Sequence, residues 1–473
     1  MEVLQRTANR GSISTASYEI DNSLKFEADN TEYLSKTPSS AGNRRTWTLS
    51  VWIKRTELAS GASMQILSAG DTYLHFDADK LKANFRSAGT NFFFATNRVF
   101  RDTSAWYHIV LQCDTTQGTD TNRAKLWVNG ESQTADWLNS YSNMSQNYET
   151  LMNNDNAHRV GMYLDGSTPV ELFNGYMAEM HLVDGTALEP TSFGEFDDNS
   201  GIWKPKAYAG SHGTNGFYLD FKDSANLGND ASGGTDFAET NIAAADQATD
   251  TPTNNFATFN VAQPRASGTT IAEGGTEMYI NSNYQTAVSS IAVSKGKWYA
   301  EFIPGSHTCY VGFVDVLEWT IPQLHNGYFL GYSGIGNTLS VGMKGTDGVI
   351  LNESNSATGA TFGNTDIISV ALDMDNRKAY FAVNGTYVNS GNPATAANPI
   401  LWYTQRDDGT PWTDVITMGI TGYTNTYHRC NFGGYSSVAI SSAASDANGY
   451  GTFEYAPPSG FYALCSKNLA EYG

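Results

Sequence analysis

The chain has 473 residues, 40% hydrophobic and 12% aromatic, so each half is long enough to bury a core, and a wholly disordered chain is excluded. The formal net charge of −20 at pH 7 argues against nucleic-acid binding and against docking on anionic membranes. The sequence has no apolar run as long as a membrane span, and its first residues, MEVLQRTANR, lack the apolar core of a signal peptide.

The first residues, 1–20, are polar, and we expect them to form an arm that docks on a partner or on the neighbouring domain. A β domain follows. Alternating apolar residues predict strands at Ser23–Glu27 and Trp47–Arg55, where Trp47, Leu49, Val51 and Ile53 share a face. Further strands are predicted at Met64–Ala69, Tyr73–Asp77, Lys80–Arg86, Thr90–Ala95, Arg159–Leu164 and Gly175–Asp184, with a long loop from Ala135 to Asn156.

Two segments, one in each half, follow the same hairpin plan. Residues 106–130 read as a strand, a polar turn and a return strand that ends in Val-Asn-Gly. Residues 366–385 (DIISVALDMDNRKAYFAVNG) do the same, and Asn-Gly tolerates the positive φ of a tight turn. The recurrence predicts two β domains of related architecture. A third hairpin is predicted at Lys297–Asp315.

Between the halves the composition becomes small and polar beyond Asp223, which is typical of a linker or a surface loop. The predicted organisation is therefore an arm at 1–20, a β-sandwich at 21–225, a linker at 226–255 and a second β-sandwich at 256–473. The four cysteines are widely scattered and lack metal-site spacing. We expect free, buried thiols, with a bridge between two of the three downstream cysteines left open.

The runs SLKFEADNTEYLSKTP, TWTLSVWIKR, WYHIVLQCDTT, RAKLWVNG and NGYMAEMHLVDGTAL resemble, in that order, the laminin-G-like members of the concanavalin A-like lectin/glucanase superfamily. The segments KWYAEFIPGSHTCYVGFVD, DIISVALDMDNRKAYFAVNG and GTFEYAPPSGFYALCSKNL resemble a SPRY domain. Both resemblances imply jelly-roll sandwiches, so the expected fold is all-β, with two concanavalin A-like sandwiches in tandem. The domain order is also similar to that of tailed-phage virion surface proteins, an analogy of arrangement only.

The laminin-G-like resemblance implies a calcium ion at the sandwich rim, for which Asp71, Asp77 and Asp79 are the candidate ligands; their alternative role is that of solvated turn residues. No other cofactor is expected. A glucanase would need paired carboxylates, and the nearest approach, Glu195-Phe196-Asp197-Asp198, reads as a solvated acidic loop. The sequence contains no nucleophile elbow and no phosphate loop. We expect no enzyme activity, and we interpret His108 and His181 as structural strand residues.

Two loops of the second domain mix aromatic rings with planar polar groups, as sugar-binding sites do. The SPRY resemblance implies that such loops lie at one end of the sandwich. The candidate ligand-binding residues are Trp319, Tyr328, Tyr332, Trp402, Tyr403, Arg406, Asp407, Asp408 and Trp412. Packing at the core rim or a subunit contact is the alternative for these residues, because protein interfaces use the same residue types.

The leading hypothesis is a non-enzymatic phage virion surface protein, a tail fibre, spike or head-surface adhesin that binds a host-surface glycan or receptor. A capsid-decoration or tail-assembly protein is the structural alternative, and a glycan-degrading tailspike is a third. We expect contact with other virion proteins through the arm and assembly into a homo-oligomer. Phage fibres are commonly trimers, but the sequence has no coiled coil to impose that state.

Overall fold

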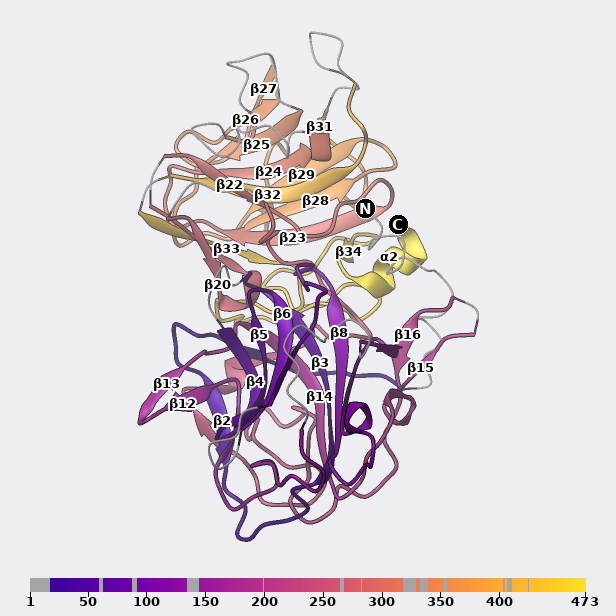
Figure 1. Cartoon of the computed structure of the whole chain (residues 1–473). Coiled ribbons are helices and arrows are strands. Elements are labelled where there is room, and N and C mark those ends of the chain that lie inside the picture. The colour runs from indigo at the N-terminus through magenta and orange to yellow at the C-terminus, as the bar shows by residue number, and fades with distance from the viewer. Residues whose placement is uncertain are drawn as a thin grey trace. The chain divides into compact units, whose positions relative to one another are not determined.

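The computed structural model describes residues 18–58, 63–86, 92–133, 144–198, 200–263, 268–281, 283–317, 329–331, 339–352, 355–402, 405, 411–423 and 425–473, with the side chains of 355 and 356 left out. These residues form two compact units, one ending at Thr253 and the other beginning at Asn254. We call them the first and the second sandwich. Both consist almost entirely of strands, as predicted (Figure 1).

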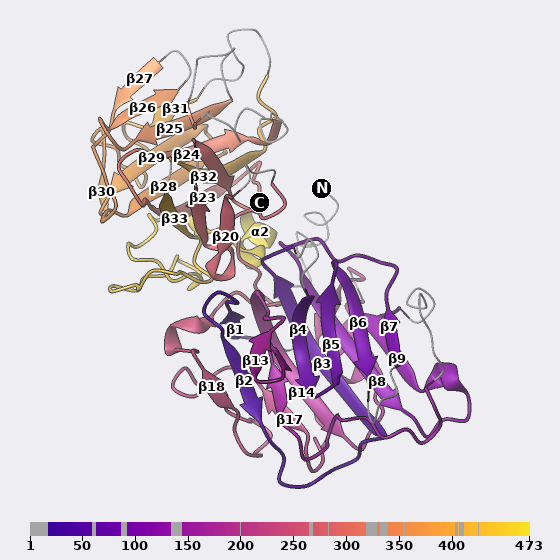
Figure 2. The ribbon, with the colours of Figure 1, turned by 60° about the vertical axis from the view of Figure 1, so that its left-hand side comes forward.

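The first sandwich contains two antiparallel sheets that lie face to face (Figure 2). The larger sheet contains, in spatial order, β10 (Glu131–Ser132), β9 (Ala124–Val128), β8 (Trp106–Asp114), β3 (Thr46–Arg55), β14 (Gly175–Asp184), β1 (Ser23–Phe26) and β19 (Gln247–Ala248), and β17 (Phe217–Leu219) also pairs with β14. The smaller sheet contains β18 (Ala238–Thr240), β2 (Tyr33–Lys36), β11 (His158–Val160), β4 (Ser63–Ala69), β5 (Thr72–Asp77), β6 (Lys80–Phe85) and β7 (Phe93–Ala95).

Short elements complete the first sandwich. They are the hairpin of β12 (Tyr163–Asp165) with β13 (Thr168–Val170), the hairpin of β15 (Gly194–Phe196) with β16 (Trp203–Pro205), and the 3-10 turns η1 (Asp120–Asn122), η2 (Pro190–Ser192) and η3 (Ala244–Asp246). In the loop predicted at Ala135–Asn156, residues 144–156 contain no strand, and 135–143 lie outside the described residues.

The core of the first sandwich lies between its two sheets. Trp47, Leu49, Val51 and Ile53 of β3 are all buried in it, as their alternation predicted. The hairpin of β8 with β9 is also confirmed, with Ile109 opposite Val128. Cys113, Cys309, Cys430 and Cys465 are free and buried in their respective units, which confirms the expectation for the thiols.

The predicted linker at 226–255 is wrong for most of its length. Strand β18 pairs with β2, and β19 pairs with β1, so residues up to Thr253 belong to the first sandwich. Acidic side chains of this segment pair with lysines of the sandwich: Asp230 with Lys36, Asp246 with Lys25, and Asp250 with Lys54. A small, polar composition resembles a linker, but here it supplies specific carboxylates to buried cations.

The end of the predicted arm also belongs to the first sandwich. Ile20 is buried, and the Tyr18 hydroxyl donates to the Glu179 carboxylate at 2.6 Å. The remainder of the arm, residues 1–17, lies outside the described residues.

The second sandwich again has two sheets (Figure 1). The first contains β20 (Thr270–Ala272), β21 (Glu277–Ile280), β33 (Thr426–Asn431), β23 (Lys297–Ile303), β28 (Ile368–Asp373), β29 (Lys378–Val383) and β30 (Thr386–Tyr387), with β31 (Ile400–Leu401) on β29 and β34 (Tyr462–Ala463) on β23. The other contains β22 (Gln285–Val288), β32 (Ile416–Gly422), β24 (Tyr310–Asp315), β25 (Ser340–Lys344), β26 (Val349–Asn352) and β27 (Asn355–Thr358). The turn η4 (Glu273–Gly275) and the helix α2 (Ser466–Tyr472) complete the unit.

Strands β28 and β29 form the predicted hairpin, with Ile368 opposite Val383 and Asp373 opposite Lys378. Ile368, Val370 and Leu372 pack between the sheets, as predicted. The opposite face of β28 is buried too, because Ala371 packs in a second cluster with Tyr299 and other residues. A strand covered on both faces explains why Ser369 and Ala371, at the alternating positions, are small.

The hairpin predicted at Lys297–Asp315 is wrong. Strand β23 pairs with β28 and β33 in one sheet, whereas β24 pairs with β25 and β32 in the other. The intervening residues 304–309 therefore cross from sheet to sheet. The sequence of a short polar connection does not show whether the two strands that it joins pair with each other or lie in different sheets.

Candidate functional site

Two of the predicted ligand-binding residues are described, and both are core residues. Trp402 and Trp412 are 4% and 5% exposed. The Trp402 ring packs edge-on against Phe313, with centroids 5.0 Å apart. Their prediction as ligand contacts is therefore wrong, and the alternative of core packing holds for them. The other seven, Trp319, Tyr328, Tyr332, Tyr403, Arg406, Asp407 and Asp408, lie outside the described residues.

The predicted calcium ligands do not form one site. Asp71 pairs with Arg86 and accepts from the Tyr163 hydroxyl, and Asp77 pairs with Lys82. Asp79 is buried between two arginines, Arg55 and Arg101. Across the described part of the chain, no group of three His, Cys, Asp or Glu side chains is placed to hold a metal ion. Arginine and lysine occupy the oxygens that a calcium ion would need.

Glu195 and Asp197, the nearest approach to a glucanase pair, share one cation. Lys204 Nζ lies 3.4 Å from Glu195 Oε1 and 3.3 Å from Asp197 Oδ2. Glu195 lies on β15, and Asp197 is buried, so the expectation of a solvated loop is wrong for Asp197. A shared ammonium stabilises both carboxylates in the charged form, whereas a general acid must hold a proton.

A serine–histidine pair lies on the outer face of the larger sheet of the first sandwich. Ser50 Oγ and His108 Nε2 are 2.8 Å apart, and the Trp203 indole N–H donates to His108 Nδ1 at 2.9 Å. Because that indole can only donate, His108 Nδ1 carries no proton, and the neutral ring carries it on Nε2. Burial lowers the pKa of His108 to about 3. The imidazole therefore donates to Ser50 and cannot act as its general base.

Glu179 lies beside this pair, at a β-bulge in β14 where its φ is +49°. Its carboxylate accepts from the hydroxyls of Tyr18 and Tyr218, at 2.6 and 2.7 Å. Burial opposes ionisation, but hydrogen bonds from His181 and the two tyrosines hold the pKa of Glu179 below its usual range. The bulge turns the carboxylate toward these donors. Glu179 thus anchors Tyr18 to the sheet.

The second sandwich carries an exposed aromatic surface at one rim. Two connections join its sheets there, one from β21 to β22 and one from β32 to β33. Together with the strands that flank them, they present four tyrosines, Tyr279, Tyr284, Tyr423 and Tyr427, which we call the tyrosine rim. The rings of Tyr279 and Tyr427 are 4.7 Å apart between centroids, and so are those of Tyr284 and Tyr423.

The strand register explains how these pairs form. Tyr279 stands directly opposite Tyr427 in the pairing of β21 with β33. Tyr284 and Tyr423 each stand one residue beyond the pair of Gln285 with Gly422. The Tyr279 hydroxyl donates to Asn425 Oδ1 at 3.4 Å, which joins β21 to the connection between β32 and β33. Cross-strand aromatic pairs are among the more favourable contacts on a sheet, so the rim is preorganised.

Exposure makes the tyrosine rim available to a ligand. Tyr423 is 41% and Tyr427 49% exposed, which is unusual for side chains of this size. Three exposed asparagines, Asn281, Asn283 and Asn425, lie on the same connections. Aromatic faces stack on sugar C–H groups, and amides donate to and accept from hydroxyls, so this surface has the chemistry to bind a carbohydrate. The sequence prediction missed it because the four tyrosines are far apart in the chain, although the density of Tyr and Asn at 279–284 and 423–427 is a usable signal.

A comparison with protein families identifies the superfamily that the first sandwich resembles. Residues 28–191 match the family model of the concanavalin A-like lectin/glucanases superfamily, named Laminin_G_3. The match covers about a third of the chain and lies within the first sandwich. It confirms the laminin-G-like resemblance for that part and the concanavalin A-like fold.

No curated protein matches the chain significantly. Among solved structures, a putative carbohydrate binding protein from Bacteroides ovatus is 16% identical over 47% of this chain and 59% of its own length, with a TM-score of 0.34. The SPRY domain of human HERC1 is 16% identical over 36% of this chain and 96% of its own, with a TM-score of 0.25. Mouse laminin alpha1 domains LG4-5 are 10% identical over 88% of each chain, with a TM-score of 0.30.

Proposed function

We propose that this chain is a non-enzymatic glycan-binding protein and that the tyrosine rim of the second sandwich is its contact surface. The observation that carries the proposal is the pair of exposed, preorganised rings of Tyr423 and Tyr427 beside three exposed asparagines. The match of the first sandwich to a superfamily of lectins and glucanases supports it. The carboxylate chemistry favours binding over hydrolysis, because Glu195 and Asp197 share a lysine.

The finer proposal is a virion surface protein of a tailed phage, a fibre, spike or head-surface adhesin that attaches to a host-surface glycan. Its support is the similarity of the domain order to such proteins, together with an acidic surface that keeps the chain off nucleic acid. Among the described residues, no helix is long and apolar enough to cross a membrane. Assembly as a homo-oligomer and attachment to other virion proteins through the N-terminal arm are parts of the same proposal.

Decoration of a capsid or assembly of a tail is the second candidate. The observation in its favour is that the tyrosine rim also contains a charged pair: Arg429 Nε lies 2.5 Å from Glu277 Oε2, and the guanidinium lies 6.0 Å from the Tyr427 ring centroid. Tyrosine and arginine together are the residues that dominate protein–protein contacts. In this case the tyrosine rim would bind a neighbouring protein.

A glycan array distinguishes these functions. The wild-type chain is compared with a Tyr423→Ala/Tyr427→Ala double variant, and Phe196→Ala serves as the matched control because Phe196 is 48% exposed on the first sandwich. Removing two stacking rings costs about 1–3 kcal/mol of binding free energy, so we expect a loss of affinity of roughly fivefold or more. Phe196→Ala should bind as the wild type does.

If the double variant still binds the glycan as the wild type does, the binding site lies outside the tyrosine rim. The wild-type chain could instead bind no glycan but bind, through the same tyrosines, virus particles that lack this protein. That result would favour the decoration of a capsid or tail. Thermal melting of each variant, monitored by circular dichroism, checks that these substitutions of exposed residues leave the fold intact.

A further inference from the structure

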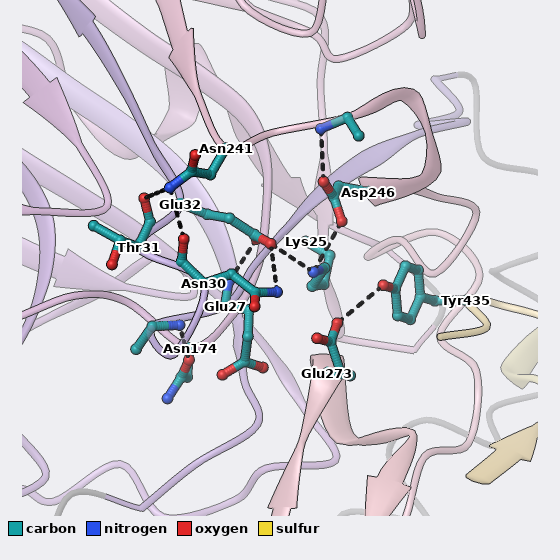
Figure 3. Close-up of polar contacts among 12 residues, drawn as sticks. Lys25, Glu27, Asn30, Thr31, Glu32, Asn174, Asn241, Asp246, Glu273 and Tyr435 are labelled. Atoms are coloured by element: carbon teal, nitrogen blue, oxygen red, sulfur yellow. Dashed lines mark hydrogen bonds and ion pairs between the residues drawn. The ribbon is translucent and has the colours of Figure 1, made fainter. Parts of the chain in front are cut away.

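A lysine and two carboxyl groups meet on the face of β1 that is turned away from the core of the first sandwich, and all three side chains are buried. Lys25 lies on β1 between Leu24 and Phe26, which point into the core, so its side chain leaves the opposite face. Its Nζ lies 2.9 Å from Asp246 Oδ1 and 3.1 Å from Glu32 Oε1 (Figure 3). Lys25, Glu32 and Asp246 are only 1%, 2% and 7% exposed.

The two carboxyl groups have different environments. Glu32 is held by three donors: its Oε2 accepts from the Glu27 backbone N–H at 2.7 Å, and its Oε1 accepts from Asn30 Nδ2 and from Lys25 Nζ, both at 3.1 Å (Figure 3). Asp246 comes from a segment more than 200 residues further along the chain, and its Oδ2 accepts from the Ala243 backbone N–H at 2.8 Å. The local hairpin positions Glu32, whereas Asp246 is brought to Lys25 by tertiary structure.

A proton in this cluster is favoured by the position of its two carboxyl groups. Both contact the Lys25 nitrogen, and two carboxylates this close repel each other when both are ionised. Burial raises the pKa of Glu32, the Lys25 charge opposes this, and the Asp246 charge raises it further. The protonated form of Glu32 is therefore favoured more than in an exposed glutamate, while Asp246 contacts the amine.

From this geometry we infer that the Lys25 amine and the Asp246 carboxyl group condense to an intramolecular isopeptide bond, with Glu32 as the acid that transfers the protons. The Lys25 ammonium first gives one proton to the Asp246 carboxylate, which leaves a neutral amine beside a neutral carboxylic acid. The amine nitrogen then attacks Asp246 Cγ.

Glu32 donates its proton to an oxygen of Asp246 and takes a proton from the attacking nitrogen, so it ends as it began. A C–N bond forms, a C–O bond breaks, and one water molecule leaves. The balance is an ammonium and a carboxylate giving an amide and water, without oxidation or reduction and without another reactant.

Three physical features favour the reaction. The nitrogen and the carboxyl group are already in contact, which replaces a bimolecular encounter by an intramolecular one. The product removes two opposite charges from a buried site, where each is costly to hold. The water that is released passes from a dry interior to bulk solvent. Exclusion of water from the buried site slows the reverse reaction, hydrolysis of the amide.

The bond would have a mechanical consequence that is independent of what the tyrosine rim binds. It would join β1 to the turn η3, and residue 253 ends the first sandwich shortly beyond. Tension that enters at residue 22 and leaves at residue 253 would pass through the cross-link and bypass residues 26–245. The first sandwich would then transmit force without unfolding.

Intact-mass spectrometry of the denatured full chain tests the inference. Condensation removes one water, so we expect the wild-type mass to lie about 18 Da below the mass calculated from the sequence. Peptide mapping should recover a branched peptide in which Lys25 Nζ is joined to the side chain of Asp246. Lys25→Arg, which keeps the charge but cannot form this bond, and Glu32→Gln, which keeps the size of the acid, should both show the full mass.

Lys54→Met is the matched control, because Lys54 is an equally buried lysine that pairs with Asp250 in the same segment. The mass of this variant should still lie below the mass calculated from its sequence. A full mass for the wild-type chain overturns the inference, and this result does not depend on whether any variant folds. A branch between Lys25 and Glu32, or an undiminished shortfall in Glu32→Gln, also overturns it as stated. None of these outcomes bears on glycan binding.

Discussion

At the scale of single residues, burial decides what the polar side chains of this protein do. His108 shows this most clearly: the Trp203 indole N–H fixes its tautomer, and its ring stacks on Trp52 with centroids 4.7 Å apart. The sequence placed His108 on a strand as a structural residue, and its hydrogen bonds confirm that interpretation. The donor that fixes the tautomer lies 95 residues away, which no local pattern reveals.

The buried histidine predicts that stability falls in acid. The pKa of His108 is about 3 in the folded chain against an ordinary value of 6.5, so the unfolded chain binds the proton more tightly. The stabilisation is fully present above pH 6.5 and is lost as the pH falls toward 3. At pH 5 His108 alone should reduce the free energy of unfolding by about 2 kcal/mol.

Urea denaturation at a series of pH values measures this effect. His108→Gln should unfold with a shallower dependence on pH than the wild type, because one group that takes up a proton on unfolding is gone. His307→Gln, at an exposed position, is the control and should keep the wild-type slope. Equal slopes in all three proteins would contradict the burial argument for His108.

At the scale of elements, the two halves repeat one hairpin and its turn. Asn129-Gly130 joins β9 to β10, and Asn384-Gly385 joins β29 to β30, each as a two-residue turn with both φ angles positive. Such turns match the twist of the strands they join. In each half an aromatic ring covers the glycine, Trp203 over Gly130 and Tyr455 over Gly385. The sequence predicted the turns, whereas the covering rings come from distant segments.

Alanine substitutions separate the two constraints on these glycines. At Gly166, in the β12–β13 hairpin, φ is +60° and a new Cβ would meet nothing within 4 Å, so only the cost of a positive φ applies, about 1 kcal/mol. At Gly130, φ is +76° and the Cβ would overlap the Trp203 ring, which adds about 1–3 kcal/mol.

Chemical denaturation should therefore rank Gly130→Ala below Gly166→Ala in stability. Removal of the ring by Trp203→Ala in the Gly130→Ala background should restore little of the lost stability, because Trp203 also donates a hydrogen bond to His108. Equal costs at Gly130 and Gly166 would show that the ring yields to the methyl group.

The sequence pattern within a strand does not show which other strand it pairs with. The alternation in Lys297–Asp315 correctly predicted strands β23 and β24 but assigned them to one hairpin, although they lie in different sheets. The same limit applies to the site. Trp402 and Trp412 belong to the core, whereas Tyr423 and Tyr427 are exposed, and aromatic composition alone did not separate the two pairs.

At the scale of the whole molecule, the first sandwich depends on residues 226–253, which the sequence assigned to a linker. These residues supply Asp230, Asp246 and Asp250, each paired with a lysine of the sandwich. They also add β18 to the smaller sheet and β19 to the larger sheet.

Two truncated chains test this dependence. A chain that ends at residue 253 should fold and melt cooperatively. A chain that ends at residue 225 lacks β18 and β19 and leaves Lys54 without Asp250, at a cost of about 3 kcal/mol or more for that buried cation, so it should be largely unfolded. Thermal melting and limited proteolysis compare the two, and a chain ending at 225 that melts like the longer one would disprove the dependence.

The sequence by itself determined that this is an all-β protein with two sandwiches, because period-two alternation and positive-φ turns are local properties that each strand and hairpin carries within a few residues. Only the tertiary structure decided which strands share a sheet, where the first sandwich ends and which aromatic rings reach the surface. Those outcomes depend on contacts between residues such as Lys25 and Asp246, or Tyr279 and Tyr427, that lie more than 100 positions apart in the chain.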